Sequence, residues 1–234
     1  IVLNHIDLSV GSIVAVVGAI SGVLMNTMNF PVWLTIIIAL IVGALIGAMQ
    51  GFWVAHLAVP SFIVTLAGQL LFRGITMIIL KGKTIAPFPT SFQFLSSKFV
   101  PEFLPPIFGL KANAVLFAIL ASVFLVITQL RNRRKKIKYN ITVESNTRFA
   151  IKQVALISVI SGFFYLLGRY EGIPIILLIL LSLTLMYNYI MNRTKLGRHV
   201  YAVGGNIKAA TLSGIQSNKI TFLGFVNMGI LAAV

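Results

Sequence analysis

The sequence has no cysteine among its 234 residues, and only four residues are acidic. The absence of cysteine excludes a disulfide framework, a thiolate metal site and a cysteine nucleophile. The carboxylates and histidines are scattered along the chain, at Asp7, Glu102, Glu144, Glu171, His5, His56 and His199. None of them forms an H-E-x-x-H motif, and no G-x-S-x-G occurs. The pattern predicts a chain that is not an enzyme.

One stretch, Gly82-Lys83-Thr84, is similar to the end of a phosphate-binding loop. That motif needs a first glycine five residues before Gly82, and this position is Met77. The sequence therefore predicts no ATP site on this chain.

Charge is rare as well, since 58% of the residues are hydrophobic and 10% are charged. No Asp, Glu, Lys or Arg lies between Leu8 and Phe72, whereas a membrane-spanning helix needs only about 20 apolar residues. We therefore expect an all-α, polytopic membrane helix bundle. About seven spans are predicted, at residues 8–25, 33–55, 60–80, 112–130, 153–170, 173–191 and from about 220 onward.

The ends of the sequence also lie in unusual places, because it begins with Ile1 and stops at Val234 inside an apolar run. We expect residues 1–234 to be a single transmembrane domain of a longer protein, with N-terminal and C-terminal parts missing.

The few charges are mostly basic and unevenly placed, with a formal net charge of +15. Residues 131–152 hold 8 of the 19 Lys and Arg residues, which marks that loop as cytoplasmic. Counting crossings then places loop 81–111 outside and segment 192–219 inside. Basic clusters beside apolar spans contact anionic lipid, so we expect membrane lipid rather than nucleic acid as the partner of this charge.

Glycines four residues apart predict close helix contacts in lipid, at Gly18 and Gly22 and at Gly43, Gly47 and Gly51. The outer loop 81–111 is rich in proline and phenylalanine. This composition predicts short helices or turns at the membrane interface rather than a flexible linker.

Two polar features interrupt the apolar runs, and both are candidates for a solute pathway. Asp7 and Ser9 precede the first long apolar run, where either could cap a helix. If that helix starts inside the bilayer, its N-terminus faces a solute; if it starts at the cytoplasmic edge, the residues only cap it. Gln69 and Arg73 share one face of the third span, where such groups line a pathway or join helices.

A polar, glycine-rich stretch, RTKLGRHVYAVGGNIKAATLSGI, lies between two apolar spans at Arg193 to Ile215. We expect the Gly204-Gly205 pair to break any helix and Asn206 to cap a short amphipathic helix from Ile207 to Leu212. The small side chains of Ala209 and Ala210 would give it a smooth surface. The segment either contacts a protein partner or lies on the lipid headgroups.

Three ordered motifs resemble those of ABC importer permeases for monosaccharides. They are IDLSVGS at Ile6 to Ser12, VPSFIVTLAG at Val59 to Gly68 followed by FRG at Phe72 to Gly74, and the GGN to SGI stretch that ends at Ile215. The D-xylose type is most similar, because of EGIPIILL at Glu171 to Leu178 and an extra pair of spans with its basic loop.

The resemblance implies that segment 192–219 couples this chain to a cytoplasmic ABC ATPase. The coupling residues that it implies are Gly204, Gly205, Asn206, Ala209, Ala210, Ser213 and Gly214. ATP and Mg would then be bound by the ATPase rather than by this chain. An extracytoplasmic sugar-binding protein and a second permease subunit, forming a homodimer, would complete the importer in the bacterial inner membrane. Lys208 stands where members of the family usually carry an acid.

Together these features predict a non-catalytic permease subunit that moves a monosaccharide, similar to xylose, into the cytoplasm. One alternative is a permease of the same fold for ribose, galactose, an autoinducer furanose or a nucleoside. Another is a secondary transporter that works without ATP. Secondary transporters commonly need intramembrane carboxylates, and Asp7 is the one candidate.

Overall fold

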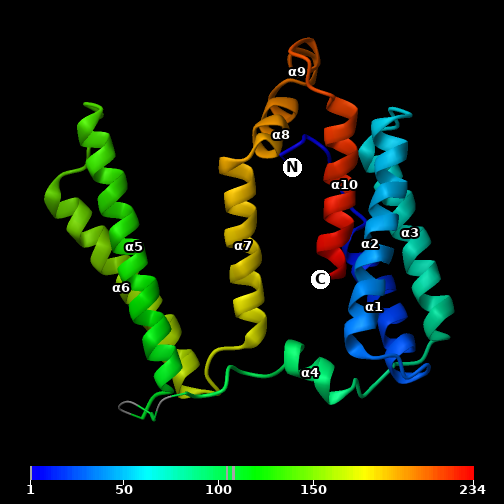
Figure 1. Ribbon diagram of the computed structural model, residues 1–234, viewed down its shortest axis with the longest axis horizontal. Helices are drawn as coiled ribbons and strands as arrows, with labels where there is room; N and C mark the ends of the chain where they lie inside the picture. The colour runs from blue at the N-terminus through cyan, green and yellow to red at the C-terminus, as the bar shows by residue number, and fades with distance from the viewer. Residues whose placement is uncertain (1, 104, 107–108) are drawn as a thin grey trace. The chain divides into compact units, whose positions relative to one another are not determined.

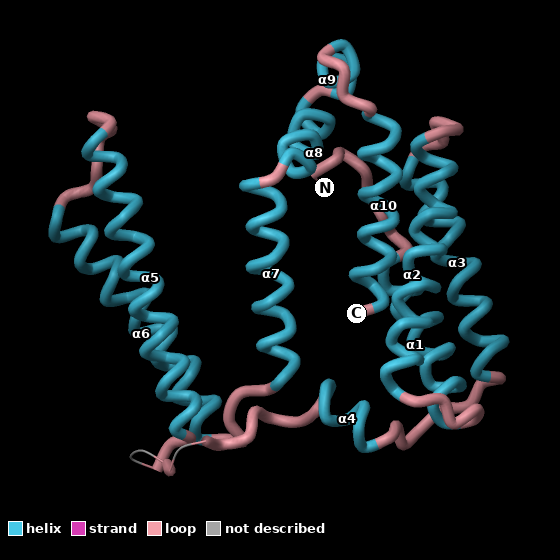
Figure 2. The backbone as a smooth tube through the Cα atoms, in the orientation of Figure 1, coloured by secondary structure: helices cyan, strands magenta, loops and turns pink. Residues whose placement is uncertain are grey.

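The computed structural model describes residues 2–103, 105–106 and 109–234, and its regular elements in this part of the chain are helices joined by loops (Figures 1 and 2). In chain order they are α1 (Val10–Asn26), α2 (Val32–Ala55), α3 (Ser61–Leu80), α4 (Thr90–Ser96), α5 (Ala112–Lys138), α6 (Asn146–Arg169), α7 (Ile175–Arg193), α8 (Lys195–Gly205), α9 (Ile207–Leu212) and α10 (Ser217–Ala233).

Five of these helices, α2, α3, α5, α6 and α7, are long and apolar enough to cross a membrane. The first expected span is the shorter apolar helix α1, and the seventh is α10; each has 17 residues. The all-α polytopic class is therefore confirmed, and the predicted count of seven is approximate. Helix α5 continues eight residues past the predicted end at 130, because residues 131–138 remain helical beyond the apolar run.

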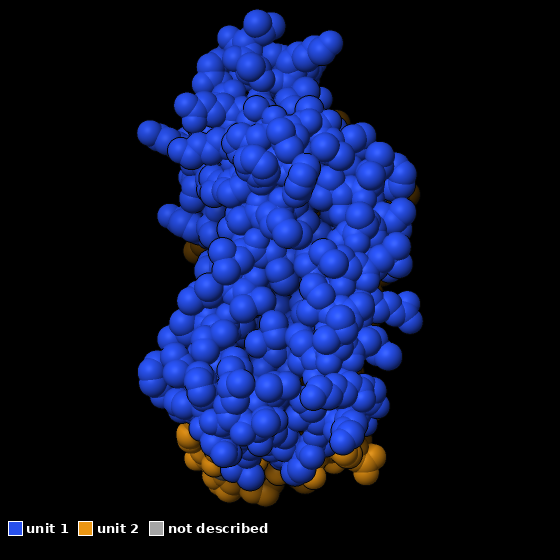
Figure 3. All heavy atoms as spheres, turned by 90° about the vertical axis from the view of Figure 1, so that its right-hand side faces the viewer, with its two compact units in different colours: residues 1–93, 182–234 blue, residues 94–181 orange. Residues whose placement is uncertain are grey.

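The chain divides into two compact units, one formed by Ile1–Gln93 with Ser182–Val234 and the other by Phe94–Leu181 (Figure 3). The second unit contains α5 and α6, the extra pair of spans that the sequence indicates.

In the first unit, α2 and α10 pack closely through glycine. A Cβ atom at Gly47 would lie 2.3 Å from the carbonyl oxygen of Phe225, and one at Gly43 would lie 2.4 Å from that of Gly229. Gly51 also faces Phe225, and Gly22 of α1 packs on Ile85. These contacts confirm the predicted role of the small residues.

Gly18 differs from the other glycines, because a Cβ atom there would meet nothing within 4 Å. It lies on the exposed face of α1, so the contact expected at this position is not formed within the described residues.

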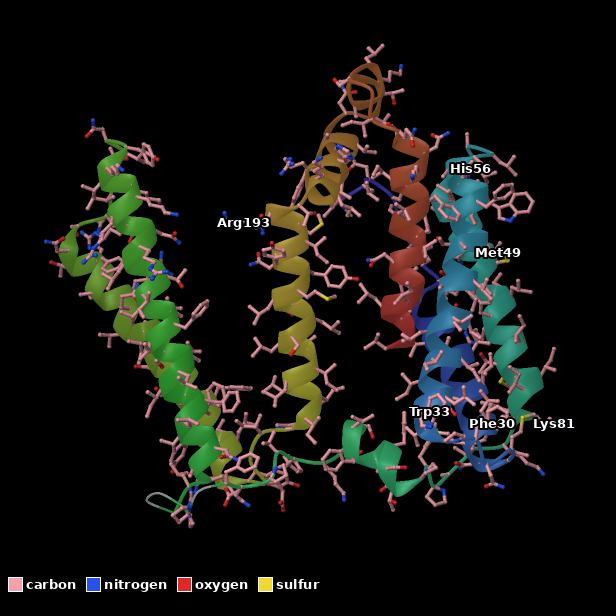
Figure 4. All side chains as sticks on the ribbon, in the orientation of Figure 1. Phe30, Trp33, Met49, His56, Lys81 and Arg193 are labelled. Carbon is pink, nitrogen blue, oxygen red and sulfur yellow. The ribbon has the colours of Figure 1, made fainter. Side chains whose placement is uncertain are left out.

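Side chains labelled in Figure 4 mark the two ends of the first unit. His56 and Arg193 lie toward the end that carries α8 and α9, whereas Phe30, Trp33 and Lys81 lie toward the opposite end. Lys81, at the start of loop 81–111, and Arg193, in segment 192–219, thus lie toward opposite ends of this unit.

The predicted outer loop contains the short helix α4 and irregular turns, as its composition indicates. The rings of Phe88 and Phe92 pack at 5.3 Å, and Asn26 of α1 donates a hydrogen bond to the carbonyl oxygen of Pro87 at 2.8 Å. Residues 104, 107 and 108 of this loop lie outside the described part of the chain.

Candidate coupling segment and interior polar cluster

The segment after α7 folds as two helices that meet at Asn206. The oxygen of its side chain accepts a hydrogen bond from the backbone N–H of Ala209 at 3.0 Å, so Asn206 caps α9 as the sequence predicts. The expected break at Gly204-Gly205 is wrong by one or two residues. Both glycines belong to the last turn of α8, and the chain leaves the helix at Asn206, where φ is −157° and ψ is 103°.

Helix α9 ends in a Schellman motif built by the SGI residues of the sequence. Gly214 has φ of 81°, a left-handed conformation that glycine adopts without steric cost. The N–H of Gly214 donates to the carbonyl of Thr211, and the N–H of Ile215 donates to that of Ala210, both at 3.0 Å. Ile215 also packs on the apolar cluster that contains Ala210. This motif fixes the C-terminal end of a helix of only six residues, and the Asn206 cap fixes its N-terminal end.

The two alanines of α9 have different environments. Ala210 is 4% exposed and packs with Val203 of α8 and Ile220 of α10. Ala209 is exposed, and Leu212 is 90% exposed. The outer face of α9 therefore presents the apolar groups of Ala209 and Leu212, with Lys208 and Thr211 also exposed, whereas the inner face attaches α9 to the bundle.

Gly204 is fixed by the N-terminal segment, residues 2–9. A Cβ atom at Gly204 would lie 1.7 Å from the carbonyl oxygen of Val2, which no side chain could tolerate. The amide group of Asn4 donates a hydrogen bond to the carbonyl of Gly204 at 2.6 Å. The start of the chain is thus bound directly to the end of α8.

The same N-terminal segment then enters the bundle beside α3. The N–H of Ile6 donates to the hydroxyl of Ser61 at 3.3 Å, and the N–H of Leu8 donates to that of Thr65 at 3.2 Å. These hydroxyls satisfy backbone groups that an extended segment in lipid would otherwise leave unpaired. The IDLSVGS and VPSFIVTLAG motifs therefore bind each other.

At the end of the N-terminal segment, Ser9 and Asp7 form a series of hydrogen bonds with Gln50 of α2. The amide nitrogen of Gln50 donates to Ser9 Oγ at 2.9 Å, and Ser9 Oγ donates to Asp7 Oδ1 at 2.7 Å. A hydroxyl has one proton, so the longer contact from Ser9 Oγ to Gln50 Oε1, at 3.2 Å, cannot be donated at the same time. Ser9 and Gln50 are both 0% exposed.

Ser9 is the N-cap residue of α1, but its side chain makes no capping hydrogen bond. Asp7 instead accepts the N–H of Ser9 through its Oδ1 atom, at 2.8 Å. The other oxygen of Asp7, Oδ2, is buried and has no hydrogen-bond partner among the described residues. Gln50 lies five residues before the end of α2, so α1 begins about 8 Å inside that end of the bundle.

A cavity of about 640 Å³ adjoins the N-terminal segment, between α7, α8 and α10. Its lining is mainly apolar, and its polar groups include Asp7, His5, Tyr187 and Asn227. The hydroxyl of Tyr187 donates to Asn227 Oδ1 and so joins α7 to α10. Cavities of this size, with a few polar groups in an apolar wall, are typical of small-molecule sites.

The other two predicted pathway residues lie elsewhere on α3. The face of α3 that packs inward carries Thr65, Gly68 and Phe72. Gln69 is half-buried and Arg73 is exposed, and neither belongs to the lining of the cavity. The structure therefore brings Asp7 and Ser9 together but does not add Gln69 or Arg73 to them.

Sequence reasoning missed Gln50, Ser61 and Thr65. A signal for the α3 residues was present, because Ser61, Thr65 and Gly68 share one helical face by their spacing of four and three. Gln50 was visible only as the single amide among the glycines of the second span.

Comparison with known proteins identifies the family of the chain. The model for the permease component of branched-chain amino acid transport systems matches residues 1–131 and 105–234, which together cover the whole sequence. No solved structure matches significantly.

The chain is similar over its full length to curated permeases. It is 33% identical to the xylose transport system permease protein XylH of Escherichia coli K12 and 34% identical to XylH of Haemophilus influenzae, covering 57% and 60% of those proteins. It is 29% identical to the ribose import permease protein RbsC of H. influenzae, covering 52% of it. The chain thus spans less than two thirds of the length of these relatives. With its membrane-length helices, it is a multi-pass membrane protein that belongs to the family of branched-chain amino acid transport system permease components.

Proposed function

We propose that this chain is part of the permease subunit of an ATP-driven importer, and that α8 and α9 dock on a separate cytoplasmic ABC ATPase. The observation that carries the proposal is the construction of α9. A helix of six residues is too short to be stable by itself, yet this one is fixed by a cap, a Schellman motif and a buried alanine. Ala209 and Leu212 nevertheless stay exposed on its outer face. A loop resting on headgroups needs no such construction.

The proposed role assigns ATP and Mg to the partner and no cofactor to this chain. ATP binding can drive transport only if the assembly binds ATP better in one conformation than in another. Docking of Ala209, Leu212 and Ser213 on the ATPase would transmit this difference, whereas Gly204, Gly205, Asn206, Ala210 and Gly214 would hold the docking helix in shape. A sugar-binding protein outside the membrane and a second permease subunit complete the proposed importer.

We assign the solute as a neutral monosaccharide similar to xylose. Two supports are the similarity to permeases named for xylose and the chemistry of the cavity. Sugar hydroxyls are donors and acceptors, and the unpartnered Oδ2 of Asp7 is an acceptor beside the cavity wall. The proposed path includes Asp7 and Ser9, and it does not depend on Gln69 or Arg73. Uptake of labelled xylose and ribose by the full-length protein with its ATPase would decide between these pentoses.

Cysteine crosslinking tests the coupling role, because residues 1–234 contain no cysteine. Ala209→Cys is introduced into the full-length protein, with cysteines outside residues 1–234 replaced by serine, and crosslinking to cysteines in the candidate ATPase is measured in membranes. We expect a crosslink whose yield changes with ATP. Ala210→Cys is the matched control, because its side chain faces Val203 and Ile220 and should stay unreactive.

Failure of Ala209→Cys to crosslink, together with solute uptake that persists without any ATPase, would overturn the proposal. That result would instead favour a secondary transporter with α9 lying on the headgroups.

A further inference from the structure

The second unit has a strongly basic end whose charge is largely unpaired. Residues 131–152 contain eight Lys or Arg residues and one acid, Glu144. Glu144 pairs with Lys152 at 3.8 Å. The guanidinium of Arg133 is occupied by the carbonyl of Glu144, by Asn146 and by the ring of Phe149, 4.5 Å from its centre.

Five basic side chains in the last two turns of α5 remain exposed and make no ion pair with any described residue. They are Arg131, Arg134, Lys135, Lys136 and Lys138. Pairs four apart on a helix are neighbours, so Arg131 repels Lys135 and Arg134 repels Lys138. The carbonyl end of α5 attracts cations in its last turn, but this attraction does not remove the repulsion between them.

The position of these charges along α5 matches the headgroup layer of a membrane. The apolar part of α5, residues 112–130, is about 28 Å long, close to the thickness of a hydrocarbon core. Arg131 therefore lies at the edge of the hydrocarbon core of the membrane. The following two turns lie in the headgroup layer or within a Debye length of it.

Apolar side chains are mixed with the charges. Ile137, Tyr139 and Ile141 are each more than half exposed, and Tyr139 is 70% exposed. Asn140, with φ of 53°, turns the chain here, and the N–H of Ile141 donates to the carbonyl of Lys136 at 2.9 Å. The turn thus holds aliphatic and aromatic groups beside the cations, a combination that suits a lipid interface better than the surface of a nucleic acid.

We propose that this basic tip, defined as Arg131, Arg134, Lys135, Lys136 and Lys138 with Ile137, Tyr139 and Ile141, binds the headgroups of anionic phospholipids. Phosphate oxygens would pair with the cations and relieve their mutual repulsion, while the apolar groups enter the interface. The inference does not depend on the proposed transport function.

Lipid binding by the full-length protein in detergent tests this site. Native mass spectrometry counts bound dioleoylphosphatidylglycerol, with dioleoylphosphatidylcholine as the neutral probe. A triple variant, Arg134→Gln, Lys135→Gln and Lys138→Gln, removes exposed and unpaired charges. Because one basic residue near a membrane surface contributes about a fivefold effect, we expect at least a tenfold loss of affinity for the anionic lipid. Binding of the neutral lipid and the thermal midpoint should not change.

A matched control removes the same charge elsewhere, through Lys81→Gln, Lys83→Gln and Lys98→Gln. The control should keep its affinity for the anionic lipid, and 0.5 M salt should remove most of the difference between the two variants. Millimolar inorganic phosphate should not displace the lipid, because it lacks the acyl chains. Equal affinity in wild type and triple variant would overturn the proposal. The proposal would also be overturned if the triple variant kept its lipid binding but lost a copurifying acidic protein or nucleic acid. That molecule would then be the partner of the basic tip.

Discussion

Gly68 should be intolerant of alanine, although it lies inside a helix where alanine is normally preferred. A Cβ atom at this position would be 2.5 Å from the side-chain nitrogen of Gln50 and 3.3 Å from the ring of Phe72. The Gln50 nitrogen would have to move by at least about 0.5–1 Å to restore ordinary contact. Such a movement breaks or stretches its 2.9 Å hydrogen bond to Ser9, and both side chains are 0% exposed.

The expected loss of stability in Gly68→Ala follows from the buried side-chain amide of Gln50. Leaving a buried donor unsatisfied costs about 1–3 kcal/mol, whereas alanine gains about 1 kcal/mol over glycine in a helix. Gly74 of the same helix is the control, because a Cβ atom there meets nothing within 4 Å. Gly74→Ala has the same helix-propensity gain without the contact, so Gly68→Ala should be less stable than Gly74→Ala by about 1–3 kcal/mol.

The assay is reversible unfolding of the full-length protein in mixed micelles, with solute uptake measured in parallel. A double variant, Gly68→Ala with Gln50→Ala, makes room for the new methyl group, so the two changes should be strongly non-additive. Equal stability of Gly68→Ala and Gly74→Ala would refute the reasoning, and so would simple additivity with Gln50→Ala.

Two further predictions concern helix packing and capping. Gly47→Ala should destabilise the protein by about 1–3 kcal/mol, because its Cβ atom would lie 2.3 Å from the carbonyl oxygen of Phe225, whereas Gly18→Ala should be neutral or stabilising; thermal unfolding compares the two. Asn206→Ala should destabilise α9 by about 0.5–2 kcal/mol and speed amide exchange at Ala209, while Asn206→Asp should keep the cap; equal exchange in both variants would contradict the assignment.

The sequence predicted those features that depend on local chemistry. Charge-free runs located most span ends to within about three residues, whereas α5 ends eight residues later and α6 begins seven residues earlier than predicted. The glycines at 43, 47 and 51 lie in the predicted helix contact. The Asn206 cap needed only Asn206 and the residues after it. The break at Gly204-Gly205 was misplaced because helix propensity predicts a bend at glycine, whereas here Gly204 is required by the approach of Val2. That contact joins residues about 200 positions apart, which no local pattern encodes.

The hydrogen-bonded cluster of Asp7, Ser9 and Gln50 also depends on contacts between distant residues, which local sequence patterns do not encode. Asp7 and Ser9 were recognisable as polar groups before an apolar run, but their partner Gln50 comes from another helix and carries no motif of its own. Arg73 was selected because charge is unusual in a span, yet it lies on an exposed face of this chain. Composition shows that a polar residue needs a partner, and only the packing of the helices shows which partner it has.

The N-terminal segment gives the coupling segment and the polar cluster a direct physical connection. Its first part is bound to α8 through Asn4 and Gly204, and its last part is bound to α3 and α2 through Leu8 and Ser9. Between these points lie only three residues, about 10 Å of extended chain, which cannot absorb a large displacement by stretching. A movement of α8 relative to α2 and α3 must therefore either carry residues 5–7 with it or break one of these hydrogen bonds. If the hydrogen bond between Asn4 and Gly204 holds, the surroundings of Asp7 change when the end of this unit that carries α9 is moved.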